Sequence, residues 1–312
     1  MAAGISTRIY QQARQSAKSR ISLGRILAWG FLILWIAITL LPIYWIARVA
    51  FSTQRDLLAN PTSLLPVNFT FDAFKRVLGL VPPDEALAQG GYSKVLNFWL
   101  YLRTTAIVTL LITSGAITFN TLAAYAFARL RFPLRDKLFS LYIVTLVMPT
   151  VLNLIPNFIL IQRLGWVGTI QGIVAPAFLG SAFGVFFLRQ FFLGLNRELE
   201  EAAKLDGAGI VGIFWHVVIP LSVPALATIF ILSFMTTWND LQWPYFAGGA
   251  GRVEGATVLT VALLVFRAQQ QSGIPDFTGM MAGTLISLLP MIGLFLVLGR
   301  KVVDSIQFSG FK

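Results

Sequence analysis

Residues 26–47 form an apolar run without a single charged side chain, and comparable runs recur along the rest of the chain. An α-helix rises about 1.5 Å per residue, so about 20 apolar residues cross the hydrocarbon core of a bilayer. The core helices of soluble domains do not need runs of this length. Because 56% of the residues are hydrophobic and only 12% are charged, we predict an all-α, polytopic membrane protein.

The apolar runs predict six transmembrane helices, at residues 26–50, 100–128, 138–161, 170–192, 217–237 and 280–298. The third run is interrupted by Pro149 and Pro156. A further apolar piece at 258–266 is too short to cross a bilayer unaided. Arg48 stands at the far end of the first span, where its long side chain is expected to reach the lipid headgroups.

Lys and Arg residues gather before the first span, after the second and after the sixth. Cytoplasmic segments of membrane proteins carry such an excess of positive charge, so both termini are predicted to be cytoplasmic. The chain then divides into a cytoplasmic N-terminal segment (1–26), a six-helix membrane domain (27–300) and a cytoplasmic tail (301–312). The loop at 51–98 carries both charge signs in balance and is expected to be external.

The composition argues against several classes of function. The net charge of +11 is spread over short clusters between apolar runs, so it fits contact with membrane lipid and not with nucleic acid. Without cysteine and with one histidine, His216, a metal or haem site is improbable and no cofactor is expected in this chain. The sequence GxxxxGK[ST] that cradles nucleotide phosphates is absent from it. We therefore expect no ATP hydrolysis by this chain and no catalytic residue in it.

The six spans hold no Asp, Glu or Lys well inside them. Proton-coupled carriers use such residues as relay sites, so this pattern argues against proton coupling. A sodium site built from carbonyl and hydroxyl oxygens would leave less trace in the sequence. A secondary, ion-coupled carrier therefore stays open as an alternative.

Residues 196–227 place charges and glycines between two long apolar runs. Asn196 is suited to cap a helix, and acidic residues in the first turn favour the positive end of the helix dipole. Asp206-Gly207 then ends this helix, and a second amphipathic piece at 210–218 leads into the fifth span. An amphipathic helix resting on lipid is one interpretation. The acidic side chains weigh against it, because the inner leaflet is itself negative, and favour a protein partner.

The sequence EEAAKLDGA, followed by IPLSVPALAT, resembles the EAA loop of permease subunits in binding-protein-dependent ATP-binding-cassette (ABC) importers. The stretches AAYAFARLRFPLRDK, SFMTTWNDLQWP and MAGTLISLLP resemble the carbohydrate, maltose-type branch of that family. The likeness extends over roughly residues 40–300. It implies the type I importer permease fold, with six transmembrane helices and a cytoplasmic coupling helix within the EAA loop, 196–219. The sequence differs from the pattern of this branch in two segments. Residues 81–94 form an apparent insertion, and the tail has a different composition.

In that family the EAA loop sits in a groove of a cytoplasmic ATPase subunit. The residues of this chain that match the loop are Glu200, Glu201, Ala202, Ala203, Asp206 and Gly207. The resemblance further implies two copies of an ABC ATPase that bind ATP and Mg, a second and non-identical permease subunit, and an extracytoplasmic substrate-binding protein. The location would be the inner membrane, and the cargo a sugar or oligosaccharide. A non-sugar solute such as a phosphorylated polyol is the alternative cargo.

Polar and aromatic residues near the third and fifth spans are open to two interpretations. Asn153 and Asn157 lie four residues apart, on one helical face, and either line a sugar pathway or join helices by hydrogen bonds. Trp243, with its neighbours Trp238 and Tyr245, either stacks on sugar or forms an interfacial belt. The spacing of Gly180 and Gly184, in contrast, predicts close packing of helices.

Overall fold

The computed structural model describes residues 23–66, 68–89, 96–268 and 276–309, with side chains as far as residue 299 except at 267 and 268. Within these ranges every regular element is a helix, which confirms the predicted all-α class. Parts of three predicted segments fall outside the described residues: 1–22 of the N-terminal segment, 90–94 of the insertion, and the side chains of the 301–312 tail.

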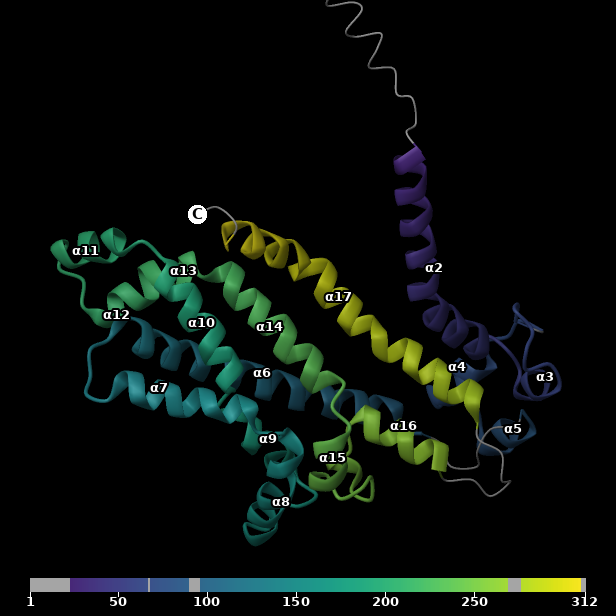
Figure 1. Cartoon of the computed structure of the whole chain (residues 1–312). Coiled ribbons are helices and arrows are strands. Elements are labelled where there is room, and N and C mark those ends of the chain that lie inside the picture. Colours follow the sequence, from purple (N-terminus) through teal and green to yellow (C-terminus); the bar gives the residue numbers. More distant parts are fainter. Residues whose placement is uncertain (1–22, 67, 90–95, 269–275, 310–312) are drawn as a thin grey trace, which may run out of the picture.

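Four of the predicted spans appear as long apolar helices (Figure 1). The first, second and sixth are α2 (Leu23–Ala50), α6 (Phe98–Arg129) and α17 (Phe277–Ser309). The fourth consists of α9 (Ile170–Phe178) and α10 (Ala182–Gly194), which together are long enough to cross a membrane. Including two helix pairs that are strongly bent, up to six spans are present in the described chain.

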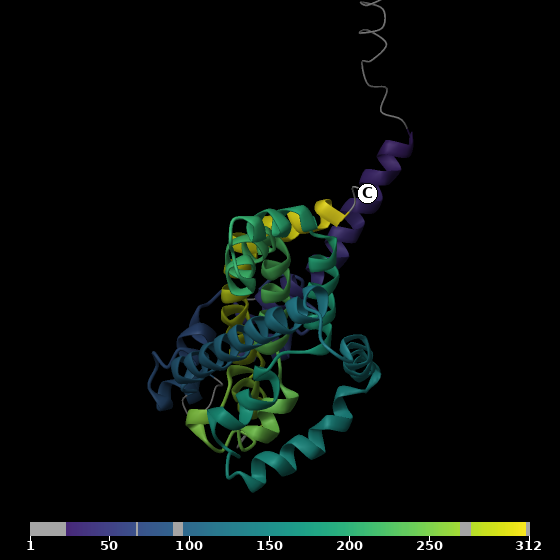
Figure 2. The same ribbon diagram turned by 90° about the vertical axis from the view of Figure 1, so that its left-hand side faces the viewer.

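The third predicted span is bent by 100°. One arm contains α7 (Arg135–Val144) and the 3-10 turn η1 (Thr145–Val147), and the other contains η2 (Thr150–Asn153) and α8 (Leu154–Arg163). Pro149 stands at the break, where its ring removes a backbone donor and forces the preceding residue out of the helical region. The expectation of one span at 138–161 is thereby corrected to two arms. Figures 1 and 2 show α8 projecting at the lower edge of the molecule.

The fifth predicted span also begins differently from expectation. Its straight part is α14 (Val223–Trp238), and a 75° bend separates it from the residues before it. Those residues form α12 (Ile210–Ile213), a five-residue π-helix η3 (Phe214–Val218) and the single turn α13 (Ile219–Leu221). Residues 217–222, predicted to open the span, therefore belong to a connector that meets α14 at an angle.

Asn120 of α6 occupies the break between α9 and α10. Its Oδ1 atom accepts a hydrogen bond from the backbone N–H of Ser181 at 2.9 Å. A Cβ atom added to Gly180 or Gly184 would lie 2.1 Å from the Asn120 amide. The predicted close packing at the two glycines is confirmed, and it is the side chain of Asn120 that fills the space.

The second span, α6, is the centre of the bundle. It packs against α9, α10 and α14, while α17 packs against α2 and α14. Three clusters of buried apolar side chains follow one another along it, built around Phe192, Ile173 and Phe98. The helix that follows α10, α11 (Arg197–Leu205), stands at one end of the bundle beside α12, and we call this the α11 end (Figure 1).

Short helices cover the opposite end of the bundle. They are α3 (Gln54–Ala59), α4 (Asp72–Val77), α5 (Pro83–Ala88), α15 (Gln242–Ala247), the 3-10 turn η4 (Glu254–Ala256) and α16 (Leu259–Ala268). A buried ion pair ties α4 to the start of α17, because Arg76 Nη2 lies 3.1 Å from Asp276 Oδ1. The same guanidinium donates to Thr278 Oγ1 at 2.8 Å. The elements at this end are therefore held together by a buried ion pair as well as by apolar packing.

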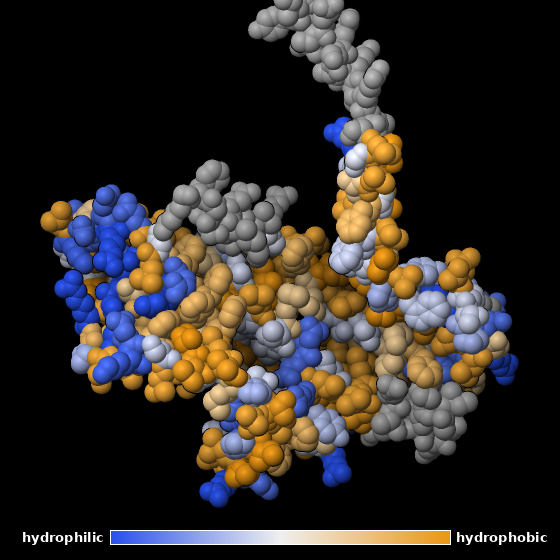
Figure 3. Space-filling model, in the orientation of Figure 1, coloured by the Kyte–Doolittle hydropathy of each residue, from blue (hydrophilic) through white to orange (hydrophobic). Residues whose placement is uncertain are grey.

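Within the described residues, the first span touches the rest of the chain only near its C-terminal end. Its apolar window has no buried residue, and Figure 3 shows its hydrophobic side chains standing clear of the bundle. Arg48 departs from expectation, because it is 1% exposed and does not extend toward headgroups. Its Nη2 atom donates to the carbonyl of Asn60 at 3.0 Å, and its guanidinium lies 5.1 Å from the ring of Trp45. Arg48 thus fixes the loop after α2.

Candidate functional site: the EAA segment and a polar cavity

The helix α11 begins and ends as its sequence predicts. Asn196 is the N-cap, and its side chain accepts a hydrogen bond from the backbone N–H of Glu198 at 3.0 Å. At the other end the N–H of Ala208 reaches the carbonyl of Ala203, and the N–H of Gly207 reaches that of Lys204. Gly207 has φ +84°, a left-handed conformation that glycine adopts without strain. The helix is therefore defined by local hydrogen bonds at both ends.

Four of the six residues that match the EAA loop lie on the exposed face of α11 or just beyond it: Glu201, Ala202, Asp206 and Gly207. Leu205 lies among them and is 90% exposed. Ile210 and Val211, which follow shortly after it, are exposed as well, and exposed apolar side chains gathered at one end of a helix are typical of surfaces that contact another protein. Ala203 is half-buried and packs on the cluster around Phe192.

Glu200 faces inward, unlike the other residues of the EAA segment with acidic side chains. Its Oε1 atom lies 2.7 Å from Nε of Arg129, the last residue of α6, and these side chains are 10% and 4% exposed. Arg129 Nη2 also donates to the carbonyl of Leu195 at 2.9 Å, just before α11 begins. This pair joins α11 to the central helix α6. The sequence had offered Arg129 only as one member of a basic cluster.

The connector from α11 to α14 packs tightly on the bundle. Ile213, Phe214 and Val218 are buried in the cluster around Phe192, which also contains Ala225 of α14. His216 of the same segment is exposed, with Nδ1 3.0 Å from the carbonyl of Gly212. The segment α11–α14 is thus held at two places, by the Arg129–Glu200 pair and by this apolar core.

A cavity of about 460 Å³ lies where α6, α8, α9, α14 and α15 meet, and it brings Asn153 and Asn157 together with residues from the end of α14. Its size lies within the range of small-molecule sites. The lining side chains are Val108, Ile112, Thr150, Asn153, Leu154, Asn157, Ile173, Pro176, Ala177, Thr236, Thr237, Asp240, Gln242, Trp243 and Pro244. We call it the polar cavity.

Asp240 and Trp243 are fixed in the wall of the polar cavity by hydrogen bonds. Asp240 Oδ1 accepts from the backbone N–H of Trp243 at 3.4 Å, and the Asp240 carbonyl accepts from Thr260 Oγ1 at 2.8 Å. The indole N–H of Trp243 donates to the carbonyl of Ile173 at 3.0 Å. Burial raises the pKa of the Asp240 carboxyl above its ordinary value, and backbone hydrogen bonds from Trp243 and Gln242 partly oppose that shift.

The aromatic residues near Trp243 have separate environments. Trp238 is buried, stacks on Phe234 and donates its indole N–H to the carbonyl of Ser287 at 3.1 Å. Tyr245 is half-buried and packs on the cluster around Ile173. Of these three aromatic side chains, only Trp243 lines the polar cavity.

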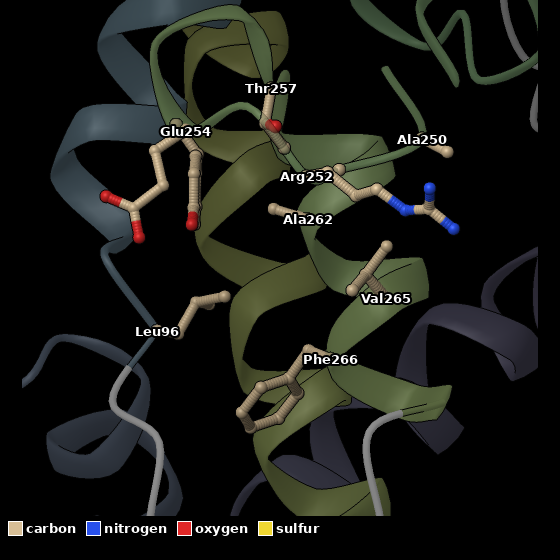
Figure 4. Close-up of a pocket in the computed structure, with 10 residues that line it drawn as sticks. Leu96, Ala250, Arg252, Glu254, Thr257, Ala262, Val265 and Phe266 are labelled. Carbon is tan, nitrogen blue, oxygen red and sulfur yellow. The ribbon is translucent and has the colours of Figure 1, made fainter. Parts of the chain in front are cut away.

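A second cavity, of about 410 Å³, lies at the end of the molecule remote from α11, between the start of α6 and α16. Figure 4 shows the side chains of Arg252 and Glu254 extending to opposite sides of it, with Ala262, Val265 and Phe266 among the apolar side chains of its wall. Its rim thus carries one charge of each sign. We call this the Arg252–Glu254 cavity.

Residues 116–306 match the model of the family described as the binding-protein-dependent transport system inner membrane component. The chain is 30% identical over 278 residues to the sn-glycerol-3-phosphate transport system permease protein UgpE of Escherichia coli O1:K1 / APEC, covering 89% of this chain and 94% of that protein. UgpE of Yersinia enterocolitica serotype O:8 is 33% identical over 213 residues, covering 68% and 74% of the two chains.

The fold is similar to a chain in the crystal structure of a bacterial ABC transporter involved in the import of the acidic polysaccharide alginate. The two superpose with a TM-score of 0.74 at 25% sequence identity. The similarity covers 90% of this chain and 98% of the other.

Proposed function

This chain belongs to the family of binding-protein-dependent transport system inner membrane components, the permease subunits of ABC importers, and we propose that it carries a sugar or oligosaccharide across the membrane and couples this movement to a partner ATPase through α11. The observation that carries the proposal is the position of the EAA segment. Its exposed face is free to contact another protein, while its inner face is joined by Glu200 to the central helix α6.

The coupling follows from these contacts. A partner that grips Glu201, Ala202, Asp206 and Gly207 moves α11 as a body, because both its ends are capped. The Arg129–Glu200 pair transfers that movement to α6, and the apolar core of the connector transfers it to α14. Both helices border the polar cavity. Closure of the ATPases would in this way change the access to the cavity.

The remaining partners belong to the same proposal. Two copies of an ABC ATPase would bind α11 and its counterpart on a second, non-identical permease, and ATP and Mg would bind to the ATPases. The exposed apolar surface of α2 and of α7–α8 is consistent with contact to a companion subunit and to membrane lipid. The α11 end and both termini would be cytoplasmic, and the end with the Arg252–Glu254 cavity would meet the extracytoplasmic binding protein.

The proposed cargo is a sugar or oligosaccharide. The neutral hydrogen-bonding side chains of the polar cavity, Asn153 and Asn157 among them, suit a hydroxylated solute. A phosphorylated polyol is the second candidate, favoured by the name of the relatives that transport sn-glycerol-3-phosphate.

The test is uptake by proteoliposomes that contain this chain, its companion permease, the ATPases and the binding protein. We expect solute accumulation that requires ATP on the ATPase side and persists when proton and sodium gradients are collapsed. Uptake driven by an ion gradient without the ATPase subunits would instead establish the secondary carrier.

A further inference from the structure

The side chains that line the polar cavity are all neutral except that of Asp240. Its polar groups are amides and hydroxyls, and none of the described residues lining it is Lys or Arg. The whole chain carries 24 Lys and Arg residues against 13 Asp and Glu. The positive charge of the protein is thus located away from this cavity, and the one ionisable group in it is acidic.

The neutral side chains retain hydrogen-bonding capacity for a solute. Asn153, Asn157, Thr237 and Gln242 make no side-chain hydrogen bond within the described part of the chain. Each amide offers two N–H donors and an oxygen acceptor, and the hydroxyl offers one donor and two lone pairs. A hydroxylated solute donates and accepts in the same way, so it satisfies these groups without a charge on either side.

Among the described residues of the polar cavity, no Lys or Arg side chain is available to pair with an anion. Moving a phosphate or carboxylate out of water is strongly unfavourable unless a cation or several charge-assisted hydrogen bonds replace the water. The apolar part of the wall, formed by Val108, Ile112 and Ile173, cannot replace the hydrogen bonds that an anion loses when it leaves water. The carboxylate of Asp240 repels an anion and accepts hydrogen bonds from hydroxyl groups.

We propose that the polar cavity binds an uncharged, polyhydroxylated solute and discriminates against anions such as phosphate esters and uronates. The inference rests on the proposed import function and specifies its substrate class. Trp243 contributes an aromatic ring whose orientation is fixed by the hydrogen bond to Ile173. Its flat face suits the apolar C–H surface of a sugar ring, while the amides of Asn153 in η2 and Asn157 in α8 contact the hydroxyl groups.

The test uses the complete importer in proteoliposomes, supplied with an equimolar panel of neutral di- and oligosaccharides, polyols, sugar phosphates and uronides. Mass spectrometry of the lumen identifies what accumulates with ATP. We expect neutral members only. ATP-dependent accumulation of a phosphate ester or uronide would overturn the substrate class and leave the import function standing. Absence of any ATP-dependent accumulation would refute the import function, and this inference with it.

Variants of residues in the polar cavity test whether this cavity causes the preference for neutral solutes over anions. Asn157→Leu removes a neutral hydrogen-bonding group and should lower neutral uptake at least about fivefold, the equivalent of one or two lost hydrogen bonds. Asp240→Lys should lower it as well and raise anion uptake relative to neutral uptake. Asp136→Asn, an exposed carboxyl on α7 outside the cavity, is the matched control and should change neither. If Asp240→Lys and Asp136→Asn give the same ratio of anion to neutral uptake, the cavity does not set the charge preference.

Discussion

Arg129 Nε lies 2.7 Å from Glu200 Oε1, so the last residue of the central helix forms an ion pair with the inner face of the EAA segment. The pair is almost fully buried, and Arg129 holds the start of the segment as well through the carbonyl of Leu195. The acidic residues at the beginning of α11 therefore have different roles. Glu200 faces the central helix of its own chain, and Glu201 is exposed on the face that we propose contacts the ATPase.

Breaking the Arg129–Glu200 pair should damage both folding and coupling. Arg129→Gln or Glu200→Gln leaves a buried charge without its partner, which costs about 3–5 kcal/mol of folding free energy. We expect a lower unfolding temperature in detergent and a loss of ATP-driven uptake. Arg131→Gln, at an exposed arginine two residues beyond the end of α6, is the control. The exchanged pair Arg129→Glu with Glu200→Arg should recover part of both properties, and equal effects of Arg129→Gln and Arg131→Gln would contradict the role of the pair.

The exposed face of α11 should control coupling without affecting the fold of the membrane helices. Glu201→Arg reverses a charge on the proposed ATPase contact, and Gly207→Pro is incompatible with φ +84°. We expect these variants to assemble but to uncouple ATP hydrolysis from uptake. The measurement is the ratio of solute taken up to phosphate released. Glu198→Gln, an exposed side chain of the first turn, serves as control, and wild-type coupling in both test variants would remove α11 from the ATPase contact.

The ion pair at the opposite end should contribute to stability in the same way. Arg76→Met leaves the Asp276 carboxylate buried and unpaired, with an expected loss of about 3–5 kcal/mol. Arg76→Met combined with Asp276→Leu should recover most of the lost folding free energy, because an apolar pair leaves no buried charge without a partner. Chemical unfolding measures whether stability falls in the order wild type, double variant, Arg76→Met. Lys75→Met, an exposed neighbour in α4 that pairs with Asp72, should change stability by less than about 1 kcal/mol. A double variant less stable than Arg76→Met would contradict the prediction.

The Arg252–Glu254 cavity should affect docking of the binding protein. Charges on an interface rim chiefly alter the association rate and its salt dependence. Reversal of either charge, Arg252→Glu or Glu254→Arg, is expected to raise the concentration of loaded binding protein needed for half-maximal uptake. The effect should shrink at high ionic strength, because salt screens exposed charges. Basal ATPase activity should stay at the wild-type level. Unchanged half-saturation in both variants would place the docking surface elsewhere.

The sequence predicts the helical class, the straight spans and the EAA helix well, because apolar length, capping residues and glycine act locally. Asn196 and Gly207 are examples, since each acts within a turn of its own position. The inward direction of Glu200 could not be foreseen, because its partner Arg129 lies on another helix. The burial of Arg48 and the 100° bend at Pro149 likewise depend on packing between segments.

Prediction from the sequence meets the same limit at the polar cavity. Asn153 and Asn157 are candidates from their spacing alone. Trp243 fits an aromatic belt as well as a sugar site, and Asp240 stands in the sequence only as a polar residue just after the fifth span. Only the folded chain brings all four to one wall. The bend in the third span and the end of α14 place them there together, and neither can be located from periodicity.

The amide of Asn120, wedged against Gly180 and Gly184, has a consequence for inheritance. Every missense change of a glycine codon introduces a Cβ atom, and at either position that atom would meet the same side chain. A damaging mutation at position 184 can therefore be rescued from a distant place in the gene, by a codon change that shortens residue 120. At position 180 the left-handed φ of +93° opposes any side chain, whatever residue stands at 120. Among descendants of this gene, positions 120 and 184 should therefore change together, and a suppressor screen that starts from a substitution at 184 should recover changes at 120.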